Sequence, residues 1–394
     1  MDTEVLFLLI VPCAFLVFGL GWLAARIDIK HLLESARTLP RSYFRGLNYL
    51  LNEQPDQALD IFIEAVQTDP DALDLYFTLG ALFRRRGESD RAIRVHESLL
   101  VRSDLSETDR ARARYELGLD FLKAGMLDRA EQSFASLRDT PQENAALAAL
   151  MDVYQIEKEW QKAIQIAQEL EQKSGQDLRK KIAQYYCEIA ERALALSQDE
   201  QAEAALLQAF TAERTHVRAA ILAGDLSLSQ GEVARALSYW LGIEKHSDLH
   251  LALVAQRVMK AYVTQHQAAE GLRLLHSWLQ KSASLDVLEV VFEQTLQQQG
   301  AEAAHQLLLA ELKRTPTLIG LDKLVQSRLN MSHGQVREEL EIVKTLLYQY
   351  ARRLSRYTCS HCGFKARQFY WQCPGCQHWN SYVPRRVEEL EVMS

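Results

Sequence analysis

Four cysteines near the end of this 394-residue chain have the spacing of metal ligands. They form two Cys-x-x-Cys pairs separated by ten residues: Cys359, Cys362, Cys373 and Cys376. Each pair offers two thiolates from one loop, so two loops fill all four corners of a tetrahedral ion and leave no open position for a substrate. We expect Gly363 and Gly375 to give the loops the backbone freedom that such turns need. The spacing therefore predicts one metal ion in a closed site that holds a shape.

The spacing does not separate zinc from iron, because both ions accept four thiolates. Iron would leave electron transfer open as a function, whereas a thioredoxin-like redox role would need one such motif beside a βαβ unit. His361 and His378 could also bind a metal, but four thiols already suffice. Such a closed site could contribute roughly 10–16 kcal/mol of apparent binding free energy to a domain too small for its own core. We expect four aromatic side chains to form a small core around the metal: Phe364, Tyr370, Trp371 and Trp379.

The other two cysteines, Cys13 and Cys187, stand alone. Six cysteines distributed in this way do not resemble the disulfide framework of a secreted protein and suit a reducing compartment. We expect Cys187 to be a small buried apolar residue.

The metal segment is basic within an acidic chain. Residues 351–386 carry seven Lys or Arg and no Asp or Glu, although the net charge of the whole chain is −7. Stacking of nucleic-acid bases on the aromatic residues is one reading of such a segment. We favour contact with an acidic protein surface, an acidic face of the same chain or anionic lipid, and we expect no nucleic acid.

The elements that carry this segment repeat with a period near 34 residues. Gly46 and Gly80 are 34 residues apart, and so are Ala58 and Ala92. Later units place small residues at similar steps: Ala130, Ala163, Ala202, Ala236, Gly271 and Ala304. This period, with two helices per unit, is typical of tetratricopeptide repeats, in which a small residue lets the helices approach closely. The fold class predicted is therefore all-α: a tetratricopeptide-repeat superhelix whose concave face is lined by the first helix of each unit.

The repeat region carries no motif for chemistry. It has neither a phosphate-binding glycine loop nor a His-Glu-x-x-His motif, and its histidines are scattered. We expect Trp160, Trp240 and Trp278 to belong to the helical core. A solenoid of this kind binds proteins, so we predict that the chain is not an enzyme.

The chain opens with an apolar segment, residues 5–25, which has no charged residue. Twenty-one such residues can span about 30 Å of hydrocarbon as a helix. A cleaved signal peptide would carry positive charge before the apolar run, whereas here Asp2 and Glu4 precede it and Arg26 and Lys30 follow it. The positive flank predicts a single-pass membrane helix with the body on the cytoplasmic side.

These patterns divide the chain into seven segments. A periplasmic N-terminus, the transmembrane helix, a juxtamembrane linker, the repeat solenoid, a connecting helix, the metal-binding domain and an acidic tail are predicted, in that order, at residues 1–4, 5–25, 26–38, 39–330, 331–356, 357–386 and 387–394. The connecting helix is expected to carry its apolar residues on one face, among them Val336, Val343 and Tyr350.

The order of an apolar anchor, tetratricopeptide units and the terminal sequence YTCSHCGFKARQFYWQCPGCQHWNSY resembles the lipopolysaccharide assembly protein B family of Gram-negative bacteria. The resemblance covers nearly the whole chain. Its most specific parts are Gly363 and Phe364 after the first cysteine pair and the run 371–374 leading into the last pair. The family's metal domain is described as rubredoxin-like, and its ligands carry over to the four cysteines at 359, 362, 373 and 376.

The resemblance implies a function that composition does not show. Proteins of this family sit in the inner membrane, face the cytoplasm and promote degradation of the deacetylase that commits carbon to lipid A, by the membrane-bound AAA+ protease FtsH. In this reading the chain is an adaptor with protease and deacetylase as partners. A membrane-tethered scaffold that gathers lipopolysaccharide assembly enzymes is the alternative, and an electron-transfer protein is a further one.

Overall fold

The computed structural model describes residues 46, 48–49, 57–58, 60–61, 73–354 and 357–392. The segment predicted to cross a membrane lies outside these residues. None of the helices within the described ranges is long and apolar enough for a membrane span. The described residues form two compact units that divide after Lys158.

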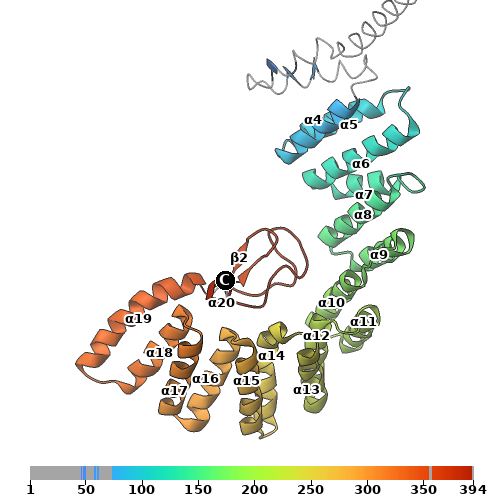
Figure 1. Cartoon of the computed structure of the whole chain (residues 1–394). Helices are drawn as coiled ribbons and strands as arrows, with labels where there is room; N and C mark the ends of the chain where they lie inside the picture. The colour runs from blue at the N-terminus through green and yellow to red at the C-terminus, as the bar shows by residue number, and fades with distance from the viewer. Residues whose placement is uncertain are drawn as a thin grey trace, which may run out of the picture. The chain divides into compact units, whose positions relative to one another are not determined.

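The first unit is a run of helical hairpins (Figure 1). Its helices are α4 (Leu73–Arg85), α5 (Ser89–Leu100), α6 (Glu107–Ala124), α7 (Leu127–Ala135) and α8 (Glu143–Glu157). Gly87 and Gly125 end α4 and α6 in the left-handed conformation, at φ of 81° and 77°. Glycine adopts this conformation without strain, so each hairpin can turn within a few residues.

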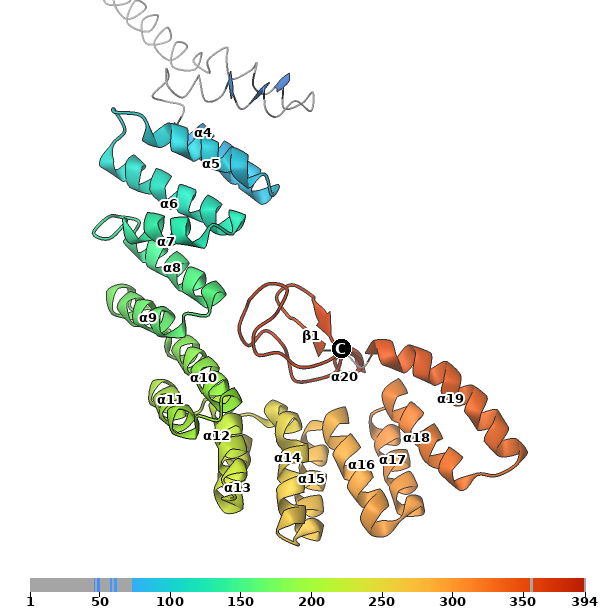
Figure 2. The same ribbon diagram turned by 180° about the vertical axis from the view of Figure 1, so that it is seen from behind.

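The second unit also consists of helical hairpins, and a small domain without long helices follows them. Its helical elements are α9 (Trp160–Ser174), α10 (Arg179–Ala195), α11 (Asp199–Ala212), α12 (Val217–Ser229), α13 (Val233–Gly242), η2 (Ile243–Lys245), η3 (Asp248–His250), α14 (Leu251–Thr264), α15 (Ala268–Ser282), α16 (Leu285–Gln299), α17 (Ala301–Arg314), α18 (Leu318–Met331), α19 (Gln335–Leu354) and α20 (Val387–Val392). Helices α10 to α19 curve around the terminal domain (Figures 1 and 2).

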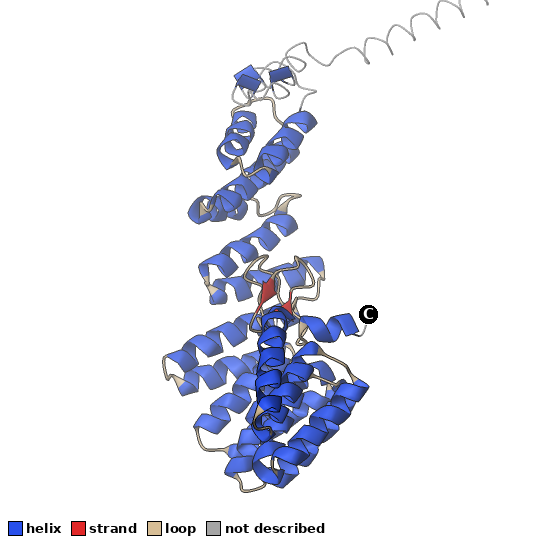
Figure 3. Ribbon diagram, turned by 90° about the vertical axis from the view of Figure 1, so that its left-hand side faces the viewer, coloured by secondary structure: helices blue, strands red, loops and turns tan. Residues whose placement is uncertain are grey.

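The terminal domain, which we call the knuckle domain, covers residues 357–386 and contains a two-stranded antiparallel sheet (Figure 3). Strand β1 (Tyr357–Thr358) pairs with β2 (Lys365–Ala366), with Tyr357 opposite Ala366. A helical array with a four-cysteine domain at its end is therefore the architecture of the described chain.

The small residues that set the period are buried, as predicted. Seven alanines in the second helices of the hairpins have no exposed surface: Ala58, Ala92, Ala130, Ala163, Ala202, Ala236 and Ala304. Trp240 and Trp278 are also fully buried, and Trp160 is nearly so. The confirmed periodicity follows from close packing of two helices, which a larger side chain at these positions would prevent.

A second spacing, present in three of the hairpins, was not recognised in the sequence. A glycine in the first helix lies against a ring sixteen residues later in the second helix, in the pairs Gly80–His96, Gly118–Phe134 and Gly224–Trp240. A Cβ atom on these glycines would come within 2.2–2.5 Å of the ring. Each glycine therefore makes room for the ring of its partner helix.

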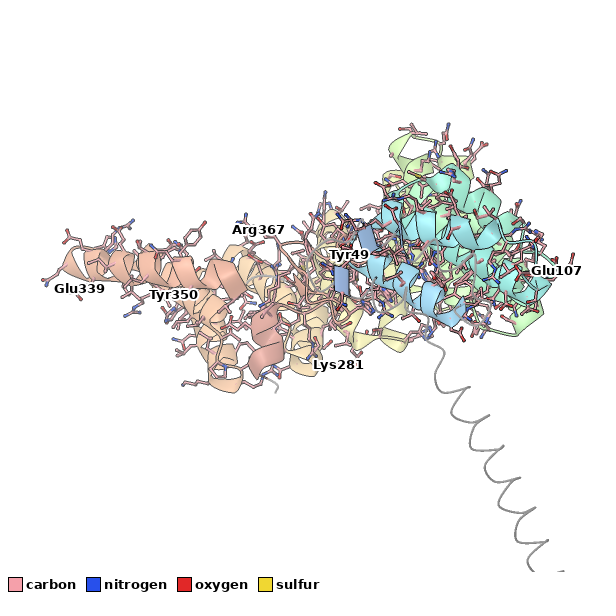
Figure 4. All side chains as sticks on the ribbon, turned by 90° about the horizontal axis from the view of Figure 1, so that it is seen from above. Tyr49, Glu107, Lys281, Glu339, Tyr350 and Arg367 are labelled. Carbon is pink, nitrogen blue, oxygen red and sulfur yellow. The ribbon has the colours of Figure 1, made fainter. Side chains whose placement is uncertain are left out.

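The connecting helix α19 is only partly covered. Tyr350 and Val336 keep 61% and 54% of their surface exposed, and Ile342, Val343 and Leu346 are exposed as well. Figure 4 shows Tyr350 and Glu339 projecting from this helix. The predicted apolar face exists in the sequence, but within the described chain α18 covers only part of it.

Replacing Gly224 by alanine is expected to lower the free energy of unfolding by about 1–3 kcal/mol. The added Cβ would lie 2.2 Å from Nε1 of the rigid Trp240 indole, which also donates a hydrogen bond to the carbonyl of Ile221 at 3.2 Å. Denaturant unfolding of the full chain measures the loss.

The matched control is Gly242→Ala, because Gly242 is also helical and has no atom within 4 Å of an added Cβ. This variant should be neutral or more stable by up to ~1 kcal/mol. Equal stability of the two variants would mean that the glycine–ring contact does not limit helix packing.

Candidate metal centre

Two equivalent turns build the centre. The N–H of Gly363 donates to the carbonyl of Cys359 at 2.9 Å, and the N–H of Gln377 donates to that of Cys373 at 2.8 Å. Gly363 and Gln377 both adopt left-handed backbone, at φ of 75° and 61°. Each turn thus closes five residues around one Cys-x-x-Cys pair and aims two sulfur atoms inward.

The two glycines of these turns serve different purposes. Gly363 supplies the left-handed conformation, as predicted, but Gly375 does not adopt it. A Cβ on Gly375 would lie 3.2 Å from the ring of Phe364, so this glycine allows close contact between the two turns. The expectation of backbone freedom at Gly375 was therefore wrong, because the left-handed position in the second turn belongs to Gln377.

The structure brings all four predicted thiols together. The Sγ atoms of Cys359 and Cys376 are 3.8 Å apart, those of Cys362 and Cys373 are 3.7 Å apart, and all four lie within 4.8 Å of one another. Four sulfurs at about 2.3 Å from a central ion in a tetrahedron are about 3.8 Å apart. The donor set and its dimensions fit one tetrahedrally bound ion such as zinc or iron.

Hydrogen bonds favour the charged form of one thiol. Burial raises the pKa of Cys359, but hydrogen bonds from Ser381 and from the backbone of Cys362 and His361 outweigh that effect and lower the pKa to about 6. Thiolates are the form that binds metal, so this environment prepares a ligand at neutral pH.

The isolated Cys187 is fully buried in α10, as predicted. Burial raises the pKa of its thiol to about 12. Its Sγ lies 3.6 Å from Nδ1 of His216, which also accepts a hydrogen bond from the N–H of Ala219 at the start of α12. Cys187 is therefore a packing residue without thiolate character.

The ring of Trp379 packs against the helices and not within the knuckle domain. Its ring meets Trp160 and Tyr185 edge to face, with centroid distances of 6.3 and 6.2 Å. The guanidinium of Arg218 lies 5.7 Å from the centroid of the same indole. Aromatic edge contacts and cation–π contact both favour this position. The expectation that Trp379 belongs to a core around the metal was wrong.

Polar contacts continue this interface. Gln184 donates from Nε2 to Oδ1 of Asn380 at 2.7 Å, and its own Oε1 accepts from Arg218 at 3.1 Å. Arg218 is nearly buried and also pairs with Glu188 at 2.7 Å and Glu191 at 2.9 Å. The arginine thus holds Gln184 in the orientation that binds the knuckle domain.

The remaining aromatic residues divide between two surfaces. Tyr370 joins Tyr357, Tyr382 and Phe369 in the small apolar cluster beside the buried cysteines, as expected for Tyr370. Trp371 stacks on His250 at 5.9 Å and packs against the core of the helices. Phe364 keeps 45% of its surface exposed. The prediction is therefore confirmed for Tyr370 and in part for Trp371, whose ring also meets Phe369 of this cluster edge to face at 4.9 Å.

The acidic tail caps two helices. Glu389 accepts a hydrogen bond from the N–H of Leu285, the first residue of α16, at 3.0 Å. Glu388 accepts from the N–H groups of Leu318 and Ile319 at the start of α18, the latter at 3.0 Å. Helix N-termini carry unpaired N–H groups and partial positive charge, so carboxylates are favourable there.

The basic segment meets an acidic residue of the same chain. Arg386 pairs with Asp286 of α16 at 2.6 Å, and Asp286 also accepts from the hydroxyl of Tyr357 at 2.7 Å. This is one of the three partners expected for the basic residues, an acidic face of the same chain.

These features define a tetratricopeptide-repeat protein with a rubredoxin-type metal domain. The family model described as "Tetratricopeptide repeat" matches residues 45–107, and the model described as "Rubredoxin metal binding domain" matches residues 357–384. Among solved structures, the pilF protein of Pseudomonas aeruginosa aligns at 17% identity over 56% of this chain and 96% of its own, with a TM-score of 0.30. A TM-score this low says nothing about function.

The chain belongs to the lipopolysaccharide assembly protein B family. It is 32% identical over 386 residues to lipopolysaccharide assembly protein B of Escherichia coli K12, covering 97% of this chain and 98% of that protein. The Haemophilus influenzae protein of the same name is 28% identical over 399 residues and is covered to 99%.

Replacing Trp379 by alanine is expected to release the knuckle domain from the helices while leaving its metal content unchanged. Loss of a partly buried indole should cost about 1–3 kcal/mol of docking free energy. Hydrogen exchange at the start of α10 and of α12 would rise. Phe364→Ala is the control, because it removes an exposed ring from the same domain; equal exchange in both variants would contradict the docking role.

The tail should make stability depend on pH. Burial raises the pKa of Glu389 to about 7, and its Oε2 is buried without a partner among the described residues. Because the folded pKa lies above the ordinary value near 4.3, the folded chain binds more protons between about pH 4.3 and 7, and stability falls as pH rises through this window.

The full effect is roughly 3–4 kcal/mol. Thermal unfolding of wild type and Glu389→Gln across this window measures it, since glutamine cannot ionise. The wild type should lose stability relative to the variant between pH 5 and pH 8. Parallel pH profiles would assign the dependence to other groups.

Proposed function

We propose that this protein is a membrane-tethered adaptor that limits lipopolysaccharide synthesis by bringing the lipid A-committing deacetylase to the protease FtsH. The observation that carries the proposal is the match to lipopolysaccharide assembly protein B of Escherichia coli over 97% of this chain, with repeats and metal domain both present. The tetratricopeptide repeats support binding of proteins.

In this proposal the four cysteines bind one ion, and the ion stabilises the fold of the knuckle domain. Cys359, Cys362, Cys373 and Cys376 occupy every corner of the tetrahedron, so no coordination position remains for a substrate. The knuckle domain in turn lies on the first helices α10, α12 and α16 through the contacts of Trp379, Asn380 and Arg386, and the tail that follows it contacts α18 through Glu388. The metal thereby fixes the surface that partners meet.

The proposed anchor, residues 5–25, places the body on the cytoplasmic side of the inner membrane. Tethering confines the adaptor, the protease and their client to one surface and raises their effective concentration. The half-life of the deacetylase in cells with and without this protein tests the adaptor role. A longer half-life on depletion supports the adaptor role. An unchanged half-life would contradict it and favour the alternative, a scaffold that gathers lipopolysaccharide assembly enzymes.

Cys373→Ser should abolish the activity without removing the protein from the membrane. Loss of a buried ligand opens the tetrahedral site, so the deacetylase half-life should rise to that of depleted cells. The readouts are the half-life, the bound metal and the amount of protein in the membrane fraction.

Cys187→Ala is the matched control, since Cys187 is equally buried but belongs to α10 and not to the metal site. It should retain its metal and its activity. Full activity of Cys373→Ser with the metal absent would show that the ion is dispensable.

Deletion of residues 1–25 should give a chain that keeps its metal but supports only slow degradation of the deacetylase by the protease. The expected cause is the loss of effective concentration at the membrane, not misfolding. Fusing an unrelated transmembrane helix should restore degradation. If the truncated chain acts at the wild-type rate, tethering has no part in the mechanism.

A further inference from the structure

Two histidines lie side by side next to the four thiols. His361 and His378 have ring centroids 3.5 Å apart and planes inclined by only 16°. Ligand atoms of His361, Cys376 and His378 all lie within 4.8 Å of one another. Both histidines are exposed, and Cys376 is half-buried. This cluster faces solvent at the edge of the centre described above.

The two turns bring the histidines together from different positions. His361 stands between the two cysteines of the first turn, and His378 stands two residues beyond the second pair. The carbonyl of His378 accepts the N–H of Cys373 at 2.9 Å, which fixes the backbone of this residue to its own turn. The pair is therefore held by backbone that the four-thiol centre already orders.

One hydrogen bond sets the tautomer of His378. Its Nδ1 lies 3.3 Å from the carbonyl oxygen of Cys376. A carbonyl only accepts, so Nδ1 carries the hydrogen and Nε2 carries the lone pair. Metal-binding histidines commonly donate their second ring nitrogen to a backbone carbonyl in this way. Nε2 of His378 is thus prepared as a ligand atom.

Cys376 supplies a shared ligand. A thiol bound to a metal ion is deprotonated outright, and its sulfur keeps lone pairs beyond the one used in that bond. With an ion among the four sulfurs, the Cys376 sulfur is an anionic donor beside two imidazoles. Imidazole and thiolate together favour divalent ions of the zinc class over magnesium or calcium.

We propose that His361, His378 and Cys376 form a second metal site, which takes one divalent ion of the zinc class and shares the Cys376 sulfur with the four-thiol centre. The stacked rings must turn until their in-plane lone pairs converge, and both side chains can do so because they are exposed. Water completes the coordination. An exposed site with a water ligand exchanges its ion more readily than the closed centre does.

The proposal is independent of the adaptor role and is tested by zinc stoichiometry. Full-length protein in detergent is equilibrated with zinc, and bound zinc is measured per chain by mass spectrometry of the metal and by competition with a chromophoric chelator. The wild type should bind two ions of unequal affinity. The variant His361→Ala/His378→Ala should bind one, and this remaining ion shows that the four-thiol centre is still folded.

His333→Ala is the matched control, because His333 is exposed in the loop before α19 and far in sequence from the centre. It should still bind two ions. One ion in the wild type would overturn the proposal, and so would two ions in the double variant, which would indicate adventitious binding elsewhere.

Cobalt tests the shared sulfur separately. The first equivalent of Co²⁺ gives sulfur-to-cobalt charge-transfer bands from the four thiols, and a second ion on the Cys376 sulfur should change these bands. The change should be absent in His361→Ala/His378→Ala. Unchanged bands in a wild type that binds two cobalt ions would overturn the sharing of Cys376.

Discussion

The contact of Trp379 with Trp160 and Tyr185 depends on a domain that cannot hold its own shape. The buried cluster of the knuckle domain consists of five residues, of which Cys359 and Cys373 belong to the metal centre. The three remaining side chains, Tyr357, Ala366 and Tyr382, do not offset the entropy of ordering some thirty residues. A bound ion, at roughly 10–16 kcal/mol for structural zinc, is the largest single favourable contribution available to this domain. The metal therefore acts on the helices through the indole that the ordered turns present.

The acidic tail at the end of the chain makes contacts with further helices, and these contacts also depend on the folded knuckle domain. Glu388 and Glu389 come directly after the knuckle domain and satisfy N–H groups at the starts of α18 and α16. The N–H groups at the start of α16 lie 104 residues before Glu389, and those at the start of α18 lie 69 and 70 residues before Glu388, with the knuckle domain between them and the tail. Arg386 and Asp286 fix the point at which the tail leaves that domain. A loosened metal centre would free both helix starts together.

The sequence predicted correctly those features whose determining residues lie close together along the chain. The buried alanines recur because two adjacent helices must approach, and that requirement acts within one hairpin. The four cysteines converge because two short turns of the same kind place them. The packing of Trp379 was predicted wrongly because a large aromatic side chain close in sequence to a metal ligand can pack in the small core of its own domain or against another part of the chain. The deciding partners, Trp160 and Gln184, are about two hundred residues away and carry no motif. The tail caps were missed for the same reason, since a carboxylate at a helix start is recognisable only once the fold joins them.

These contacts also limit how partners can bind. A tetratricopeptide array commonly offers the face formed by its first helices, but in the second unit α10, α12, α16 and α18 already meet the knuckle domain or the tail. The interface is not completely filled: a cavity of about 370 Å³ remains beside Arg218, Trp371 and Tyr382. A partner that approached this face would meet the knuckle domain or the tail at the starts of α12, α16 and α18, and would have to bind beside them or displace them from the helices. Displacement would break the Trp379, Gln184 and Glu389 contacts together, so it would require a partner whose own contacts outweigh all three. The closed metal centre thus selects which surfaces are available, although the ion itself touches none of them.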